Sequence, residues 1–133
     1  MATVKKDRPW WGVGHTLWGG ETFKCKKKAT NLGIKNGDTF RIERDLAGQV
    51  TLVPHPDNGG TWNEFHGQTN PILLNPLVTT VPGQERAYSM LVKIAEDAET
   101  KMLYFIEYTD GEIAISDSAT NPGTDETTVS VER

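Results

Sequence analysis

Apolar and polar residues alternate most regularly over residues 39–53. Thr39 to Arg44 and Gln49 to Val53 each place every second residue on an apolar face, and the residues Asp45-Leu46-Ala47-Gly48 between them are typical of a turn. Successive side chains of a β-strand point to opposite faces of the sheet. The pattern therefore predicts a β-hairpin with one buried face.

Residues 87–116 carry a second alternating pattern, which predicts a three-stranded meander. Every second residue shares a face from Tyr88 to Ile94 and again from Met102 to Tyr108, with the polar residues 96–100 as a turn between them. Asp110-Gly111 is a strong hairpin signal ahead of the apolar run Ile113 to Ile115.

The first part of this region also fits a helix. Residues 84–102 are rich in helix formers, and a helix there would make the fold α+β. The neighbouring run Leu103 to Ile106 is typical of a strand and favours the strand interpretation. The residues at helical spacing are Ala87, Met90, Leu91, Ile94, Ala98 and Met102.

The remaining segments suggest how the chain is organised. Residues 1–20 are a Trp- and Gly-rich amino-terminal arm, and its glycine density argues against a helix. The expected β domain covers residues 21–116, but its segment 54–86 holds five prolines and is expected to be irregular. Residues 117–133 are an acidic carboxy-terminal tail with a candidate edge strand.

Together these elements predict a single-domain, mainly β protein. The turn spacing suggests about seven to nine short strands, which favours an antiparallel β-sandwich or an open barrel. A length of 133 residues suits one hydrophobic core. The expected core residues are Phe40, Ile42, Val50, Leu52, Val92, Ile94, Leu103, Phe105, Ile106, Ile113 and Ile115.

Charge is unevenly distributed along the chain. Residues 1–50 hold ten of the 14 Lys and Arg residues but only five of the 18 Asp and Glu residues, so the first part is basic and the remainder acidic. This split favours an anionic partner at the front or head-to-tail contact between copies. The alternative explanation is that the basic and acidic residues pair with one another within one folded chain.

No segment has the apolar length of a signal sequence or of a membrane span. We therefore expect an intracellular protein or a component of a non-secreted particle, with no membrane partner. The one cysteine, Cys25, excludes an internal disulfide framework and a cysteine-based zinc site.

Residues suited to catalysis are sparse. His55, Asp57, Glu64 and His66 lie in the irregular segment, but their spacing matches no known metal-binding pattern. Cys25 lies among lysines, which favour a thiolate, but no histidine near it in the sequence would orient it, so a buried strand residue is the better interpretation. We predict no catalytic residue, no metal and no cofactor, and we expect the chain not to be an enzyme.

Two groups of residues are candidates for contact with a partner. Exposed aromatic rings stack on sugars or bases, although large aromatic residues also fill cores and subunit interfaces. Clustered lysines contact phosphates in a salt-sensitive way, although they also form solvated strand faces or protect a sheet edge. The candidates are Trp10, Trp11, Trp18, Lys24, Lys26, Lys27, Lys28, Trp62 and Phe65.

One segment resembles a known family. The run Leu32-Gly33-Ile34-Lys35-Asn36-Gly37-Asp38, followed by Phe40-x-Ile42-Glu43 and Val50-x-Leu52-x-Pro54, is similar to the carboxy-terminal half of the AbrB-type swapped-hairpin domain, a family of dimeric DNA-binding barrels. The upstream Ile-Pro and Arg positions of that family are absent, and residues 26–31 stand in their place. No DNA-binding residue is therefore carried over.

The sequence favours a non-catalytic structural or interaction subunit of a homo- or hetero-oligomeric assembly, of the coat, decoration or scaffold type. Its expected partners are copies of itself or other assembly subunits. Two alternatives stay open. The chain would be a glycan- or small-ligand-binding β module if its tryptophans are exposed, or a nucleic-acid-binding protein if its basic face contacts phosphates.

Overall fold

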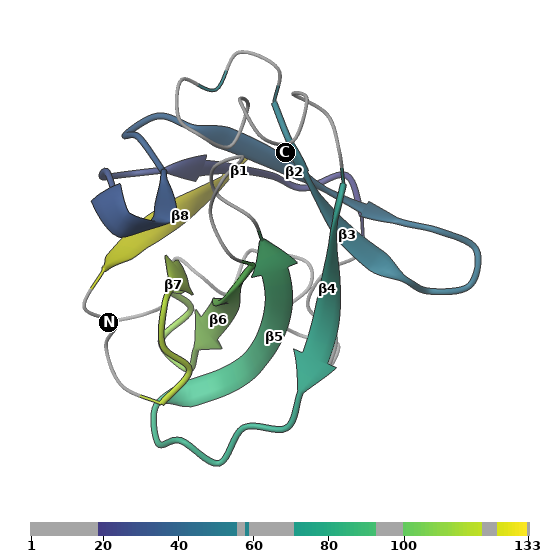
Figure 1. Cartoon of the computed structure of the whole chain (residues 1–133). Helices are drawn as coiled ribbons and strands as arrows, with labels where there is room; N and C mark the ends of the chain where they lie inside the picture. The colour runs from purple at the N-terminus through teal and green to yellow at the C-terminus, as the bar shows by residue number, and fades with distance from the viewer. Residues whose placement is uncertain (1–18, 56–57, 59–70, 93–99, 121–124, 133) are drawn as a thin grey trace.

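The computed structural model describes residues 19–55, 58, 71–92, 100–120 and 125–132. In this part of the chain, eight antiparallel strands follow one another in sequence order around a closed barrel (Figure 1). The mainly β, antiparallel prediction is confirmed. The elements are β1 (Thr22–Cys25), the short 3-10 helix η3 (Thr30–Leu32), β2 (Thr39–Arg44), β3 (Val50–Pro54), β4 (Ile72–Leu77), β5 (Gln84–Val92), β6 (Lys101–Tyr108), β7 (Ile113–Ser116) and β8 (Glu126–Glu132).

The hairpin predicted over residues 39–53 is confirmed as β2 and β3. Ile42 lies opposite Leu52, and both side chains are fully buried. The Asp45 side chain closes the turn, because its Oδ1 accepts a hydrogen bond from the Gln49 N–H at 2.8 Å. Gly48 has a positive φ of 87°, which a residue without a Cβ adopts at little cost.

The meander predicted over residues 87–116 is confirmed as β5, β6 and β7, and the helical alternative is wrong for its first part. Residues 84–92 pair with β6, with an irregularity between Gln84 and Arg86. Pairing prevails over helical spacing because it buries every second residue, as at Met90 and Val92. Residues 93–99 lie outside the described part of the chain.

The segment 54–86, which we expected to be irregular, contains β4 and the first residues of β5. The sequence did not predict a strand here because the segment contains Pro76, which cannot donate a backbone hydrogen bond to a neighbouring strand. In the barrel, β3 pairs only with residues 72–74 of β4, and β5 pairs with residues 75–77. Pro76 therefore lies where β4 has a partner on one side only, and the strand tolerates it.

The pairing of β8 differs from two predictions, the sandwich or open barrel and the edge strand in the carboxy-terminal tail. β8 pairs with β7 on one side and with β1 on the other, so the sheet closes and is neither a sandwich nor an open barrel. Closure prevails because it removes the two exposed edges that an open sheet would keep. In the family that residues 32–54 resemble, the barrel is dimeric, whereas β2 and β3 belong to a barrel closed within one chain.

Side chains fill the barrel around Phe105. Its ring lies edge-on to Phe23, with 5.2 Å between ring centroids, and also to Tyr88, at 6.4 Å. Nine of the eleven expected core residues belong to one buried cluster. Ile94 lies outside the described residues, and Ile106 is fully buried but on the outer face of β6, opposite Ala114.

We expect the substitution Phe105→Ala to lower the free energy of unfolding by about 3–5 kcal/mol, because it removes the ring that two other aromatic rings pack against. Urea denaturation followed by circular dichroism measures the loss. Leu46→Ala is the control, since Leu46 is exposed at the β2–β3 turn and its removal should cost less than about 0.5 kcal/mol. Equal losses in the two variants would contradict this assignment of the core.

Candidate functional site

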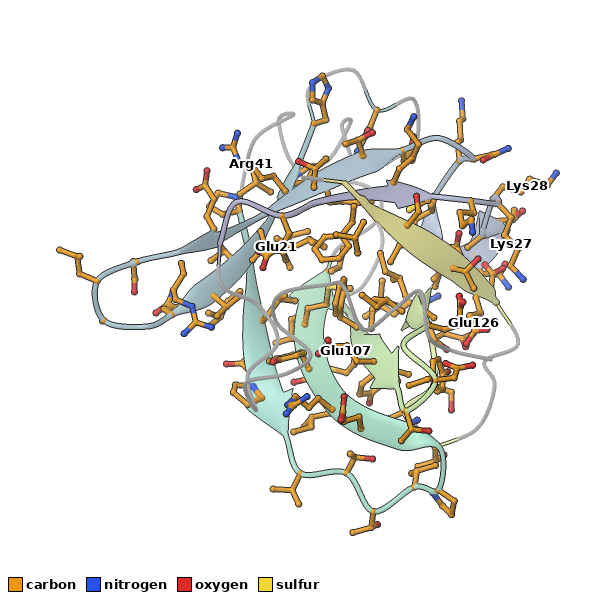
Figure 2. All side chains as sticks on the ribbon, turned by 180° about the vertical axis from the view of Figure 1, so that it is seen from behind. Glu21, Lys27, Lys28, Arg41, Glu107 and Glu126 are labelled. Atoms are coloured by element: carbon orange, nitrogen blue, oxygen red, sulfur yellow. The ribbon has the colours of Figure 1, made fainter. Side chains whose placement is uncertain are left out.

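The four candidate lysines are all exposed. Lys24 points outward from β1, and Lys26, Lys27 and Lys28 follow in the connection to β2. Figure 2 shows Lys27 and Lys28 at the outside of the barrel, on the same side as Glu126 of β8. This lysine cluster (Lys24, Lys26, Lys27 and Lys28) keeps its charge in solvent, but acidic residues of β8 and its approach lie close by.

The backbone after β1 is held by residues at the start of β8. The Thr127 Oγ1 donates a hydrogen bond to the Lys27 carbonyl oxygen. Asp125 Oδ2 accepts hydrogen bonds from the backbone N–H groups of Asn31 and Leu32, the latter at 3.2 Å. These bonds fix the path of the connection and leave the lysine ammonium groups at the surface.

Several predicted site residues lie outside the described part of the chain, namely Trp10, Trp11, Trp18, Trp62 and Phe65, together with Asp57, Glu64 and His66. His55 is described and follows β3 directly. Among the residues that the structure describes, no group of three or more His, Cys, Asp or Glu side chains is placed to hold a metal ion.

Cys25 faces the barrel interior and is 1% exposed. Burial raises the pKa of its thiol to about 12, the nearby Asp38 carboxylate adds to the rise, and a hydrogen bond with Thr127 opposes it. The neighbouring lysines point outward and do not offset the burial. A thiol in this state is a poor nucleophile at neutral pH, so the interpretation of Cys25 as a buried strand residue is consistent with its surroundings.

The outer wall of the barrel divides into a polar part and an apolar part. On β1 and β2 the outward residues are Thr22, Lys24, Thr39, Arg41 and Glu43, whereas the outward residues of β4 to β7 are largely apolar. The inward neighbours of both groups belong to the core, so the division concerns the outside alone.

Part of the apolar wall is covered by the chain itself. Ala87, Ile106 and Ala114 lie in one cross-strand row on the outer face of β5, β6 and β7, and each is 3% exposed or less. The connection after β7 folds back toward this row, because the carbonyl oxygen of Ala119 accepts a hydrogen bond from Gln84 Nε2 at 2.6 Å.

A second apolar row on the same wall is exposed. It consists of Leu73 on β4, Leu91 on β5 and Met102 on β6, which are 40%, 60% and 41% exposed. Leu91 lies directly opposite Met102, and Leu73, which pairs with Thr51 of β3, lies on β4 two residues before the Asn75–Ser89 pair that joins β4 to β5. We call these three residues the apolar row. Exposed apolar side chains gathered on one surface mark interaction sites more often than isolated ones do.

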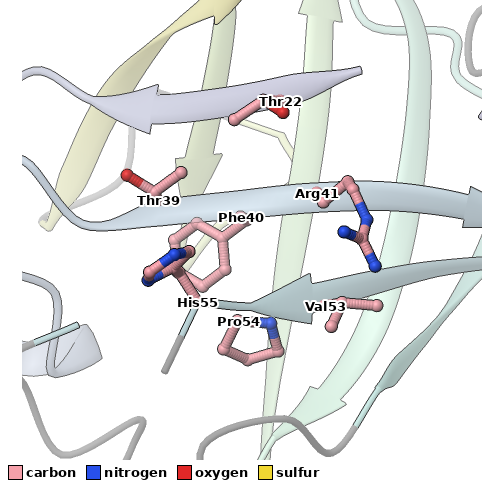
Figure 3. Close-up of a pocket in the computed structure, with 7 residues that line it drawn as sticks. All are labelled: Thr22, Thr39, Phe40, Arg41, Val53, Pro54 and His55. Atoms are coloured by element: carbon pink, nitrogen blue, oxygen red, sulfur yellow. The ribbon is translucent and has the colours of Figure 1, made fainter. Parts of the chain in front are cut away.

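An outer groove lies on the polar part of the wall, over β1, β2 and β3. It has a volume of about 330 Å³ and is shown in Figure 3. Arg41 and His55 approach it from β2 and from the end of β3, and Val53 and Pro54 supply apolar surface. Thr22, Thr39 and Phe40 complete its lining.

Acidic side chains also lie inside the barrel. Glu107 is fully buried and shares the inward face of β6 with Leu103 and Phe105, and it lies opposite Arg86 of β5. Glu21 is fully buried as well, and its Oε1 accepts a hydrogen bond from the Gly19 N–H at 2.8 Å. Figure 2 labels both carboxylates. The sequence offered one signal for Glu107, an acidic residue at an inward position of an alternating strand.

The groove and the apolar row were missed in the sequence for a common reason. Each is assembled from three strands, and the residues meet only because of the register between those strands. Alternation does predict that Arg41, Leu91 and Met102 face away from Phe40, Met90 and Leu103, but it does not predict which of the outward residues are neighbours.

Comparison with protein-family models, with curated proteins and with solved structures found no match. In the part of the chain that the structure describes, no helix has the length and apolar character needed to cross a membrane.

We expect the stability contributed by Cys25 to fall as pH rises from 9 to 12. Below pH 9 the thiol is protonated in both states. Above it, the unfolded chain loses this proton first, because the ordinary pKa of a cysteine thiol is 9.0 and the value in the folded chain is about 12. The free energy of unfolding then decreases by up to about 1.4 kcal/mol per pH unit.

The measurement compares the wild type with Cys25→Ala in urea denaturation at several pH values between 8 and 11. The advantage of the wild type should narrow above pH 9, and Tyr108, whose pKa burial raises to about 12, titrates equally in both proteins. A difference that stays constant over this range would refute the burial argument.

Proposed function

We propose that this chain is a non-catalytic interaction subunit that assembles with copies of itself. The observation that carries the proposal is the apolar row, three large side chains left exposed on the outer wall of β4, β5 and β6. Adding these residues to an interface would remove apolar area from water, which is the main driving force of most association.

A second copy is the partner that best fits this row. The fold buries another outward row of these strands, Ala87, Ile106 and Ala114, whereas the apolar row, which lies beyond the intervening Ser89 and Tyr104, is left exposed and would be buried only by a partner. Two such rows related by a two-fold axis would place Leu91 of each copy against the apolar row of the other. Self-complementary contacts of this kind are the usual interface of homodimers.

The surroundings of the apolar row suit an interface. The next outward residues along the strands are Asn75, Ser89 and Tyr104, which place polar groups beside an apolar centre. Stable interfaces commonly combine an apolar centre with a polar rim. The distribution of charge between the halves of the sequence adds a second, salt-dependent attraction between copies. Coat, decoration and scaffold proteins are the types of subunit that would use such contacts.

The two alternative functions have less support from the described residues. Glycan binding relied on Trp10, Trp18 and Trp62, all outside the described part of the chain. Nucleic-acid binding relied on the lysine cluster, whose four members are exposed, but Lys27 and Lys28 lie on the same side of the barrel as Glu126, and Asp125 binds the backbone of the connection that follows them. Those carboxylates lower the net positive charge that would attract phosphates.

We expect the wild-type chain to form dimers or larger oligomers in sedimentation velocity, and Leu91→Glu to disrupt them. Each dimer would lose two buried leucines and gain two charges, which costs at least about 3 kcal/mol and raises the dissociation constant roughly 100-fold or more.

The matched control is Leu46→Glu, the same change at an exposed leucine in the β2–β3 turn, which should leave association unchanged. Circular dichroism checks that both variants fold. The proposal fails if the wild type is monomeric at all concentrations, or if the two variants associate equally well.

A further inference from the structure

The outer groove is a feature that self-assembly through the apolar row does not use. The two surfaces lie on different strands, the groove on β1 to β3 and the apolar row on β4 to β6. A test of one therefore does not decide the other.

Strand register places two rows of outward residues across the groove. Thr22 lies opposite Arg41, and Arg41 lies opposite Val53, so these three form the first row. In the second row Lys24 lies opposite Thr39, and the His55 N–H donates a hydrogen bond to the Thr39 carbonyl oxygen at 2.9 Å. Directly opposed residues have Cβ atoms about 5 Å apart, so each row presents its side chains to the same small volume.

The end of the groove at His55 is held in place by Asn58. The Asn58 Oδ1 accepts a hydrogen bond from the Thr39 N–H at 2.8 Å, and its Nδ2 donates one to the Thr39 carbonyl oxygen at 2.9 Å. The Asn58 N–H also donates to the His55 carbonyl oxygen at 3.1 Å. Asn58 thereby takes the place of a strand residue beside β2 and holds His55 at the end of β3. A site formed before binding loses less conformational freedom when a ligand arrives.

Donors and positive charge surround the groove. Arg41 contributes a guanidinium, Lys24 adds an ammonium in the adjacent row, and the His55 imidazole carries an N–H donor in either protonation state. One carboxylate, Glu43, pairs with the Arg41 Nη2 from the next outward position of β2. The Arg41 and Glu43 side chains are both about half exposed, so an incoming anion can compete for the guanidinium.

The opposite side of the groove is apolar. Val53 faces outward and is half-buried, and Phe40 and Pro54, whose side chains are buried, complete the lining on this side (Figure 3). A ligand that fits must therefore combine an anionic group with a less polar body. A volume of about 330 Å³ lies at the small end of the range for ligand pockets and fits a compact molecule.

We propose that the outer groove binds a small organic phosphate, with the phosphate directed at Arg41 and the Thr22 hydroxyl and the carbon skeleton against Val53. Guanidinium groups recognise phosphate through paired hydrogen bonds. Several donors around one position suit a group with three terminal oxygens. A single-stranded nucleic acid fits less well, because the outward residues of β1, β2 and β3 include no Phe, Tyr or Trp on which bases would stack.

The test is a titration of the full chain followed by two-dimensional proton–nitrogen NMR, with ribose 5-phosphate as the probe. Peaks of Thr22, Arg41, Val53 and His55 should shift, and ribose without phosphate should leave them unchanged. Inorganic phosphate should bind more weakly than ribose 5-phosphate, because it lacks the carbon skeleton. No shift with millimolar ribose 5-phosphate, or shifts with a short oligothymidylate alone, would overturn the proposal.

Three single substitutions distinguish specific binding in the groove from an effect of the overall charge of the protein. Arg41→Gln should weaken binding of ribose 5-phosphate at least about tenfold, because a charge-assisted pair is lost. Glu43→Gln should tighten binding several-fold, because it removes the carboxylate that competes for Arg41. The matched control is Arg44→Gln, an exposed arginine of the same strand that does not line the groove.

Thermal unfolding checks that the three variants fold as the wild type does. Unchanged affinity in Arg41→Gln, weaker binding in Glu43→Gln, or an equal loss in Arg44→Gln would each refute the assignment of the phosphate to Arg41.

Discussion

The simultaneous pairing of β8 with β1 and with β7 is the constraint on which the rest of the structure depends. It joins Val129 to Cys25 on one side and to Ile113 on the other, so three strands meet around the interior. Closure gives the barrel a defined inside, where the rings of Phe23, Tyr88 and Phe105 pack. It also ties the connection after β1 to the start of β8, through Thr127 and Asp125.

A closed barrel has no sheet edge to offer a partner, so its contacts must use the outer wall or the ends. The wall of this barrel is chemically divided. Hydroxyl and charged groups dominate the outside of β1 and β2, and apolar side chains dominate the outside of β4 to β6. The inside of each strand contributes to one common core. Division of the wall therefore costs the core nothing, and under the two proposals each half would bind a partner of different chemistry.

Local features of the sequence were sufficient for about half of the fold. The β2–β3 hairpin follows from alternation and from Asp45 and Gly48, which act within a few residues. A sandwich or an open barrel was predicted in place of the closed barrel because pairing of β1 with β8 has no local signal. β4 was missed because Pro76 is normally excluded from strands, and the one-sided pairing that permits it depends on the neighbours.

The candidate surfaces show the same limit. The exposure of Lys24 agrees with strand alternation, because the neighbouring side chains of Phe23 and Cys25 are buried on the other face of β1. Neither the groove nor the apolar row could be predicted from the sequence, because strand order and register together decide which outward residues become neighbours. Buried acidic residues such as Glu107 are still harder to predict, because a polar group is buried only where the folded state provides contacts for it.

Closure also has a kinetic consequence. The hydrogen bond from Ser130 Oγ to the Lys24 carbonyl oxygen joins residues that are 106 positions apart in the chain. Bringing such distant segments together costs chain entropy before any contact repays it, so joining β1 to β8 is expected to be slower than forming the local hairpins. Until that step, β1 presents an unpaired edge, and an exposed lysine in the middle of this edge disfavours pairing with the wrong strand. Lys24 would then protect the chain while it folds, before any mature surface exists.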